Sequence, residues 1–329
     1  MNKISSFQAA SLAFCFSLAR MVAFRPNGEN MLICIIGELC ACAVMTALAL
    51  AAYRLPTLGK GLPAKLISSV GVIYYLYAAS LVLAVFADSM QYSFPDFYTS
   101  PAIIAALAAA AAYCSSMGVS ACGRTACAAV LISLTVFTFM AAGASSGVDT
   151  SGIHLAVTDK NSRVFSHFVW ALGNSFELPL LLTLKGHIDR PHRAAIMYTV
   201  ARAVMWAVVL ALCGCVLGDH AEQGLPVFSL AAYSKTALIE RFDALILLMW
   251  SLSALLSLSM IFLGTGECVR RIMQKRLSHK EVWFVPAAVT ASAACIISAC
   301  AVSEPPPMIL AAMLLLMLIP ASLAGGKAA

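Results

Sequence analysis

The sequence VWALGNSFELPLLL, at residues 169–182, places a glycine, three polar side chains and a proline in a stretch that is otherwise apolar. Regular helix disfavours two of these residues, because proline lacks a backbone donor and glycine weakens the helix. The stretch therefore predicts a break near residues 173–177. Unwound backbone at membrane depth is tolerated only beside protein or a watery cavity, so a cavity is expected there. The alternative is a simple proline kink with Glu177 paired inside the bundle.

The composition around this stretch is that of a membrane protein. Of the 329 residues, 61% are hydrophobic and 11% are charged, whereas a soluble domain carries roughly a quarter charged residues. A spanning helix needs about 20 apolar residues. The predicted spans are 7–25, 31–53, 63–87, 101–121, 125–145, 164–184, 194–218, 238–264, 282–302 and 307–325. We therefore predict an all-α integral membrane protein in which residues 1–329 form one transmembrane domain of about ten helices.

The basic residues predict the direction of these crossings. Cytoplasmic loops of membrane proteins hold an excess of lysine and arginine. Of the 21 basic residues, 14 fall on the side of the termini, five fall opposite, and Arg20 and Arg202 lie inside spans. Both termini are therefore expected in the cytoplasm. The net charge of +6 then reflects topology and contact with the lipid bilayer, not nucleic-acid binding.

The chain carries no motif that indicates an enzyme or a cofactor. It lacks HExxH, paired intramembrane aspartates and clustered histidines. Its 12 cysteines are interpreted as packing residues, because the close pairs Cys40/Cys42 and Cys213/Cys215 would direct their thiols to different faces of a helix. We expect no catalytic residue, no cofactor and no metal site.

Ionisable residues inside the predicted spans are the strongest functional candidates, because charge at membrane depth is costly. At about 1.5 Å per helical residue, Arg20 and Glu38 lie at similar depths in neighbouring spans, and so do Glu177 and Arg202. Two buried charge pairs are therefore predicted. Each has two interpretations: an ion pair that only fixes helix register, or part of a functional site.

Several segments resemble one known family, the spore-germination permeases. These segments are Lys3–Gln8, Phe97–Pro101, Tyr113–Arg124, Ser175–Glu177, Ile239–Leu245 and Trp250. No one of them is diagnostic, but their order and spacing across the spans match from about residue 3 to 275. The family supplies the B subunit of nutrient germinant receptors and is related to amino acid, polyamine and organocation permeases.

The resemblance implies an architecture, partners and a location. The fold would be two inverted five-helix repeats of the LeuT type, with broken spans one and six around a central site. The partners would be a membrane-bound A subunit and a lipoprotein C subunit, in the inner membrane of the endospore. One departure is that Ser17-Leu18-Ala19-Arg20 stands where the family usually has a glycine in span one, and another is that Ser257 stands where lysine is common.

The sequence and the resemblance together predict a small-nutrient site, most simply for an amino acid, between spans one, three, six and eight. Binding would shift the equilibrium between two helix arrangements and trigger germination. The predicted lining residues are Ser17, Ala19, Arg20, Tyr74, Tyr77, Gly173, Asn174, Ser175, Phe176, Glu177, Trp250 and Ser257. Two alternatives stay open: a secondary transporter of amino acids or polyamines, and a structural membrane anchor for receptor partners.

Overall fold

The computed structural model describes residues 3–26, 29–54, 62–93, 99–149, 160–222, 224–234, 242–273 and 279–300. These residues are nearly all helical, and a single β-bridge is the only strand-type pairing among them. The helices are α1 (Ser6–Val22), α2 (Met31–Arg54), α3 (Leu62–Ser93), α4 (Ser100–Ser116), α5 (Val119–Ala144), α6 (Lys160–Gly173), α7 (Glu177–Thr183), α8 (Pro191–Leu217), α9 (Pro226–Tyr233), α10 (Asp243–Met273) and α11 (His279–Cys300). Short 3-10 turns are η1 (Ser145–Gly147), η3 (Lys185–His187) and η4 (Gly218–Glu222). The predicted all-α class is confirmed.

Within the described residues, five helices are long and apolar enough to cross a membrane: α2, α3, α5, α8 and α10. The shorter helices α1 and α4 and the middle of α11 are also apolar. Large apolar side chains such as Leu131, Val204 and Leu248 are exposed on the outside of the bundle. Exposed apolar residues on helices of this length suit a lipid environment, and the chain is an integral membrane protein.

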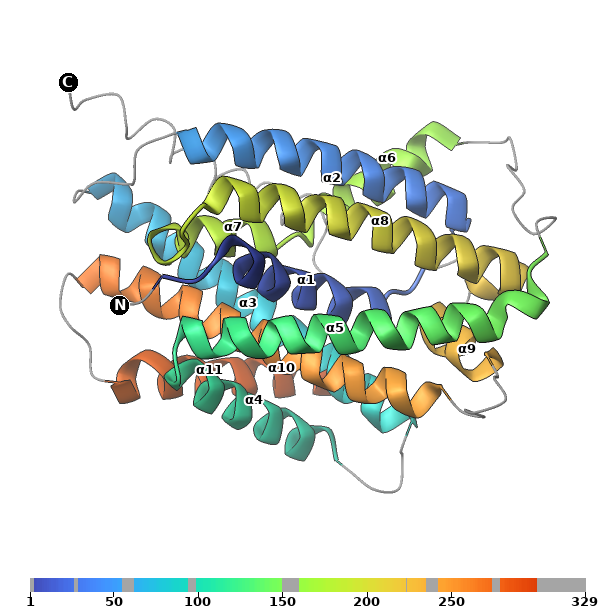
Figure 1. Cartoon of the computed structure of the whole chain (residues 1–329). Helices are drawn as coiled ribbons and strands as arrows, with labels where there is room; N and C mark the ends of the chain where they lie inside the picture. The colour runs from blue at the N-terminus through green and yellow to red at the C-terminus, as the bar shows by residue number, and fades with distance from the viewer. Residues whose placement is uncertain are drawn as a thin grey trace.

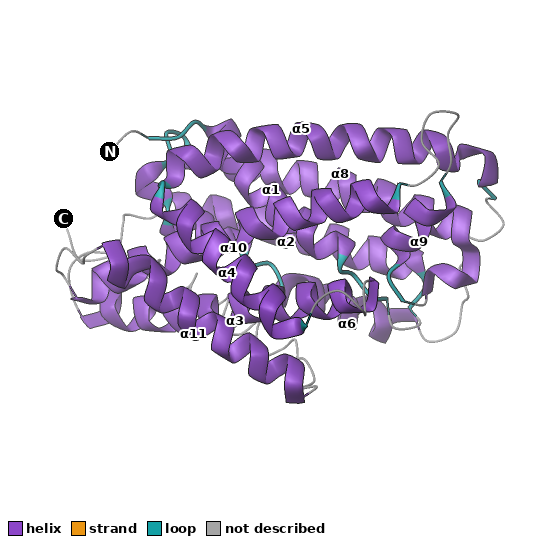
Figure 2. Cartoon of the chain, turned by 90° about the horizontal axis from the view of Figure 1, so that it is seen from below, coloured by secondary structure: helices purple, strands orange, loops and turns teal. Residues whose placement is uncertain are grey.

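Helix α1 lies in the middle of the bundle, and the long helices run side by side around it (Figure 1). It contacts α5, α8 and α10, with further contacts to α7 and α9. Figure 2, the view from below, shows the same set of roughly aligned helices. Small residues in α1, including Ala9, Ala13 and Ser17, are buried. Small side chains let neighbouring helices approach closely in a membrane, which explains the central position of this helix.

The start of α1 is fixed by two local devices. Ser5 and Gln8 form a capping box, in which the Ser5 hydroxyl accepts from the Gln8 amide and the Gln8 side chain accepts from the Ser5 amide. The preceding Ile4 pairs with Ile188 as a β-bridge, its amide donating to His187 O at 2.9 Å. The connection between α7 and α8 therefore holds the amino-terminal end of α1.

The predicted break in span one is wrong. Helix α1 runs without interruption from Ser6 to Val22. The stretch Ser17-Leu18-Ala19-Arg20 contains neither glycine nor proline, so nothing in it disfavours helical backbone. The resemblance implied the break, whereas the residues at these positions favour a continuous helix.

The predicted break in span six is confirmed. Helix α6 ends at Gly173, helix α7 begins at Glu177, and residues 174–176 between them are not helical. Pro179 lies in the first turn of α7, where its missing amide hydrogen leaves no intrahelical bond unmade. The two halves of span six are therefore separate helices, and the proline belongs to the start of the second.

Several helix ends differ from the predicted spans. Helix α10 extends to Met273, beyond the predicted end at 264, and Glu267 there pairs with Arg270 and Arg271 one turn on. The connection between α4 and α5 is a tight turn at Gly118, with φ of +86°, and lies earlier than residues 122–124. The short helix α9 was not predicted. The predicted tenth span, 307–325, lies outside the described residues.

A glycine sets the distance between α2 and α6. A Cβ atom at Gly37 would lie 2.8 Å from His167 Cδ2 and 3.1 Å from the Phe168 backbone nitrogen. The 2.8 Å contact is shorter than real Cβ atoms make and the 3.1 Å contact is unusually tight, so a side chain there must displace His167 or move the two helices apart. By contrast, a Cβ atom at Gly186 in η3 would have nothing within 4 Å.

Gly37→Ala is expected to destabilise the protein by about 1–3 kcal/mol, because it overpacks the contact between α2 and α6. The measurement is the unfolding midpoint of purified protein in detergent. Gly186→Ala is the matched control and should leave the midpoint unchanged. Equal midpoints for all three proteins would contradict the close α2–α6 contact.

Candidate functional site

Side chains from α1 and from span six itself donate hydrogen bonds to the backbone carbonyls at the break in span six. Arg20 Nη1 donates to Asn174 O at 2.9 Å and to Ala171 O at 3.3 Å. Within span six, Asn174 Nδ2 donates to Trp170 O and Ser175 Oγ donates to Ala171 O. A helix end leaves backbone carbonyls without partners, and in a membrane these must be satisfied internally. Arg20 and the two polar residues supply the missing donors.

A shared carboxylate joins Arg20 to a second arginine. Glu38 Oε1 accepts from Arg20 Nη2 at 2.7 Å and from Arg202 Nε at 2.7 Å, with Arg202 Nη2 in close contact as well. Arg202 Nη1 donates to Ser175 Oγ and to the Tyr198 hydroxyl, each at 2.9 Å. Glu38 on α2 thus connects α1, α8 and the break.

The sequence predicted two separate charge pairs, and the structure combines their members in one cluster. Arg20 and Glu38 are in contact at 2.7 Å. Arg202 Nη1 lies 3.7 Å from Glu177 Oε2, a longer contact than the one that Arg202 makes with Glu38. Both oxygens of Glu177 are buried, and neither accepts a hydrogen bond within the described part of the chain. Glu177 is therefore the loosely held member of the cluster.

The four charges sum to zero, since two arginines oppose two glutamates. Arg202 and Glu177 are completely buried, and Glu38 and Arg20 are 1% and 11% exposed. An unpaired charge at the membrane centre costs about 3 kcal/mol on insertion scales. Pairing offsets this cost only when every partner stays in place. The cluster therefore fixes α1, α2, α7 and α8 relative to one another.

A cavity of about 70 Å³ lies beside the break, against α1, α3, α10 and the end of α6. Two polar side chains, Arg20 and Asn174, face it within a mainly aromatic and aliphatic wall. The lining residues are Phe16, Ala19, Arg20, Ala23, Phe24, Leu81, Val82, Val85, Trp170, Asn174, Phe176 and Trp250. A concave apolar site with few polar groups is typical of small-molecule binding.

Five of the predicted lining residues line this cavity: Ala19, Arg20, Asn174, Phe176 and Trp250. They come from α1, the break and α10, and α3 completes the wall. Trp250 is fixed by its indole nitrogen, which donates to Ala19 O at 2.9 Å.

The other predicted residues lie around the cavity and make structural contacts instead. Ser17 accepts from Trp206 Nε1, Tyr74 donates to Gly173 O and Ser257 donates to Ser253 O. Ser175 and Glu177 contact Arg202, as described above. Tyr77 packs against the apolar core.

Sequence reasoning missed seven lining residues. In α3 it selected tyrosines 74 and 77, whereas the residues at the cavity are Leu81, Val82 and Val85, about one to three turns further along the helix. Phe16, Ala23, Phe24 and Trp170 are apolar residues in apolar segments. Nothing in their type distinguishes them from packing residues, so only the helix arrangement could have identified them.

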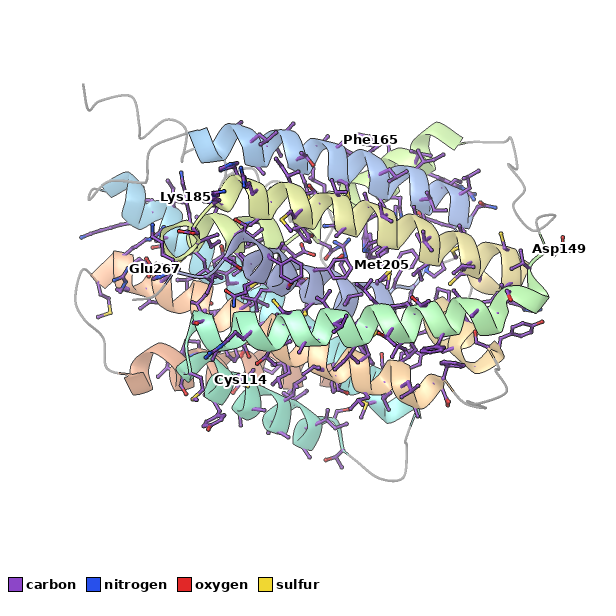
Figure 3. All side chains as sticks on the ribbon, in the orientation of Figure 1. Cys114, Asp149, Phe165, Lys185, Met205 and Glu267 are labelled. Atoms are coloured by element: carbon purple, nitrogen blue, oxygen red, sulfur yellow. The ribbon has the colours of Figure 1, made fainter. Side chains whose placement is uncertain are left out.

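A second polar cluster lies at the carboxyl end of α7, near the amino-terminal end of α1. Arg271 Nη2 donates to Thr183 O at 2.9 Å and Arg271 Nε contacts Glu267 Oε1 at 3.2 Å. Tyr75 shares a 2.7 Å hydrogen bond with Thr183 Oγ1. Figure 3 shows Lys185 and Glu267 at this end of the bundle and Asp149 at the other. Helix α7 is thus tied to α3 and α10 at its carboxyl end.

The cluster predicts unequal effects for its two carboxylates. Glu38→Gln removes the shared counter-charge of two buried arginines and should destabilise the protein by about 3–5 kcal/mol. Glu177→Gln should cost less, because no hydrogen bond to its oxygens is lost. Unfolding midpoints in detergent measure both variants.

A double variant that restores the balance of charge is the control for this comparison. Adding Arg20→Gln to Glu38→Gln leaves one arginine opposite one glutamate and should recover part of the lost stability. Equal losses for the two single variants, or no recovery in the double variant, would contradict a shared role for Glu38.

A solved structure shares this arrangement of helices. The chain is similar to MHP1, a nucleobase-cation-symport-1 family transporter, in a closed conformation with bromovinylhydantoin bound. The TM-score is 0.63 at 12% sequence identity, over 95% of this chain and 75% of the transporter. At this identity the likeness establishes the fold alone, which is that of a membrane transporter. No curated protein matches the sequence.

The sequence itself matches one family model, described as spore germination protein, over residues 31–301. The match spans α2 to α11 and includes both halves of span six. It agrees with the family named from the sequence motifs, and it indicates a permease or receptor subunit rather than an enzyme. The chain belongs to the spore germination protein family of membrane permeases.

Proposed function

We propose that this chain is the membrane subunit of a spore nutrient germinant receptor and that it binds a small amino acid in the cavity beside the break. The observation that carries the proposal is the position of Arg20, which lines the cavity, bonds to the backbone of the break and contacts Glu38. A ligand that contacts Arg20 would act on all three. Family membership supports the germination context.

The residues that line the cavity suit an amino acid in its zwitterionic form. Arg20 Nε is buried and has no acceptor among the described residues, so a shift of the guanidinium toward the cavity would give it a donor for a carboxylate. Trp170, Phe176 and Trp250 line the same space, and aromatic faces attract an ammonium group. Glu177 stays outside the cavity wall and keeps its contact with Arg202.

The volume favours a small ligand. A cavity of about 70 Å³ holds roughly five to seven water-sized groups, about the size of glycine or alanine. Larger amino acids would require the wall to move. The cavity lies toward the carboxyl end of α1. The basic-residue pattern predicts that this end faces away from the cytoplasm, the side from which nutrients would arrive.

Binding would act through the break. A carboxylate at Arg20 competes with Glu38 and with the carbonyls of Ala171 and Asn174 for the same guanidinium. The two halves of span six would then be held differently with and without ligand. A ligand shifts a conformational equilibrium only by its differential affinity for the two states, and Arg20 provides that difference.

The proposed partners and location follow from the family. The receptor would include a membrane-bound A subunit and a lipoprotein C subunit in the inner membrane of the endospore. Both termini of this chain would lie in the cytoplasm, as the basic-residue pattern predicts.

A second candidate function is favoured by the fold. The transporter-type helix arrangement suits a secondary transporter that moves an amino acid through the same cavity. Uptake by proteoliposomes separates the two: a transporter accumulates the labelled amino acid, whereas a sensor binds it without accumulation. A structural anchor, the third alternative, would neither bind nor accumulate it.

Filling the cavity is expected to abolish the nutrient response. Val85 lines the cavity, and Val85→Phe places an aromatic ring in the space that the ligand needs. Spores whose receptor carries this subunit should release dipicolinate at least about tenfold more slowly in response to the cognate amino acid, because a loss of 1.4 kcal/mol in binding is tenfold. The assay compares a panel of single amino acids, with subunit accumulation measured in the same spores.

Val204→Phe is the matched control. Val204 is 59% exposed on α8, where added size meets lipid, and the response should stay normal. Val82→Leu, a smaller addition to the same wall, should give an intermediate loss. A normal response from Val85→Phe at normal accumulation would show that the cavity is not the nutrient site.

A further inference from the structure

A second cluster of polar side chains lies beyond the cavity, where the connection from α1 meets α2 and α6. Glu29 Oε2 is 3.0 Å from His167 Nδ1 and 3.7 Å from Cys34 Sγ. The three ligand-type atoms all lie within 4.8 Å of one another. Among the described residues, no other group of three histidine, cysteine or acidic side chains is this compact. The proposed function makes no use of it.

We propose that Glu29, Cys34 and His167 bind a divalent transition-metal ion, with zinc as the best chemical fit. Thiolate and imidazole are zinc ligands, whereas calcium and magnesium prefer oxygen alone. Zinc bond lengths of about 2.0–2.3 Å in a tetrahedron place neighbouring ligand atoms about 3.2–3.8 Å apart. The two measured separations lie close to this range, so small side-chain shifts complete the site.

The charges at the site balance. A thiolate and a carboxylate together neutralise a divalent cation, so the loaded site carries no net charge at the edge of the membrane. Three protein ligands leave a fourth position open for water or a solute. Cys34 and His167 are buried, whereas Glu29 is 26% exposed. The ion would therefore enter past Glu29.

The histidine is held in position by its neighbours. Its ring packs edge-on against Phe24 at 5.7 Å between centroids and lies 5.3 Å from the ring of Trp170. Gly37 leaves the space that His167 occupies, since a Cβ there would overlap it. Metal ligands held by packing of this kind lose little freedom on binding.

A bound ion would link the beginning of α2 and the residues just before it to α6. Glu29 lies two residues before α2, Cys34 lies in the first turn of α2, and His167 lies in α6, the helix that ends at the break. Phe24 and Trp170, which pack on His167, also line the cavity. The site therefore lies directly behind one wall of the cavity.

Cobalt(II) is the probe for the test, because a cobalt–thiolate bond gives a near-ultraviolet charge-transfer band. The full chain, purified in detergent and stripped with chelator, should develop this band to a limit of one ion per chain. Zinc should displace the cobalt and raise the unfolding midpoint, whereas magnesium and calcium should do neither. Cys34→Ser should abolish the band, and Glu29→Gln should keep it with at least about tenfold weaker binding, the loss seen when metal-site contacts are removed.

The chain has 12 cysteines, so a matched control is needed. Cys42 is buried in the same helix, and Cys42→Ser should leave the band intact. A band that persists in Cys34→Ser would place the ion on other thiols and overturn the proposal. A wild-type protein with no saturable binding would show that the three side chains form only a hydrogen-bonded cluster. Glu29→Gln changes a partly exposed residue, so it tests the site even where Cys34→Ser fails to fold.

Discussion

The sharing of one carboxylate by two arginines is the interaction on which the rest of the structure depends. Glu38 accepts from Arg20 in α1 and from Arg202 in α8. Each arginine in turn holds part of the break: Arg20 binds its carbonyls and Arg202 binds Ser175. Without Glu38, two positive charges would lie buried and, within the described part of the chain, Glu177 would be left to oppose them at 3.7 Å from Arg202. The unwound backbone of span six is therefore stabilised from α2, a helix that contributes no residue to the cavity.

This dependence explains how a helix break can persist inside a membrane. Broken backbone exposes carbonyl groups that lipid cannot satisfy, and here charged donors satisfy them. The same arginine forms part of the cavity wall, so the group that stabilises the break is also the one that a ligand would contact. In the proposed function, both the stability of the break and the recognition of a ligand would depend on the Arg20 guanidinium. The structural and functional interpretations of the Arg20 charge pair are therefore compatible, because the guanidinium that bonds to Glu38 and to the break belongs to a side chain that also lines the cavity.

The sequence predicted the all-α class, the break in span six and the burial of the charged residues within the spans, because each depends on local chemistry. Proline, glycine and buried charge are visible without a structure. The combination of two predicted pairs into one cluster was not predictable, since it depends on α2 lying against both α6 and α8. The family resemblance implied a broken span one, yet the residues from Ser17 to Arg20 contain no glycine and form continuous helix. The aliphatic wall from α3 and the grouping of Glu29, Cys34 and His167 also come from packing between distant segments.

The central claim is that an amino acid binds at Arg20 beside a break in span six. A density map of the purified receptor with its triggering amino acid bound tests it most directly. We expect ligand density against the Arg20 guanidinium, between Trp170, Phe176 and Trp250, with residues 174–176 non-helical. Ligand density elsewhere in the receptor, or a continuous helix through residues 173–177, would contradict it.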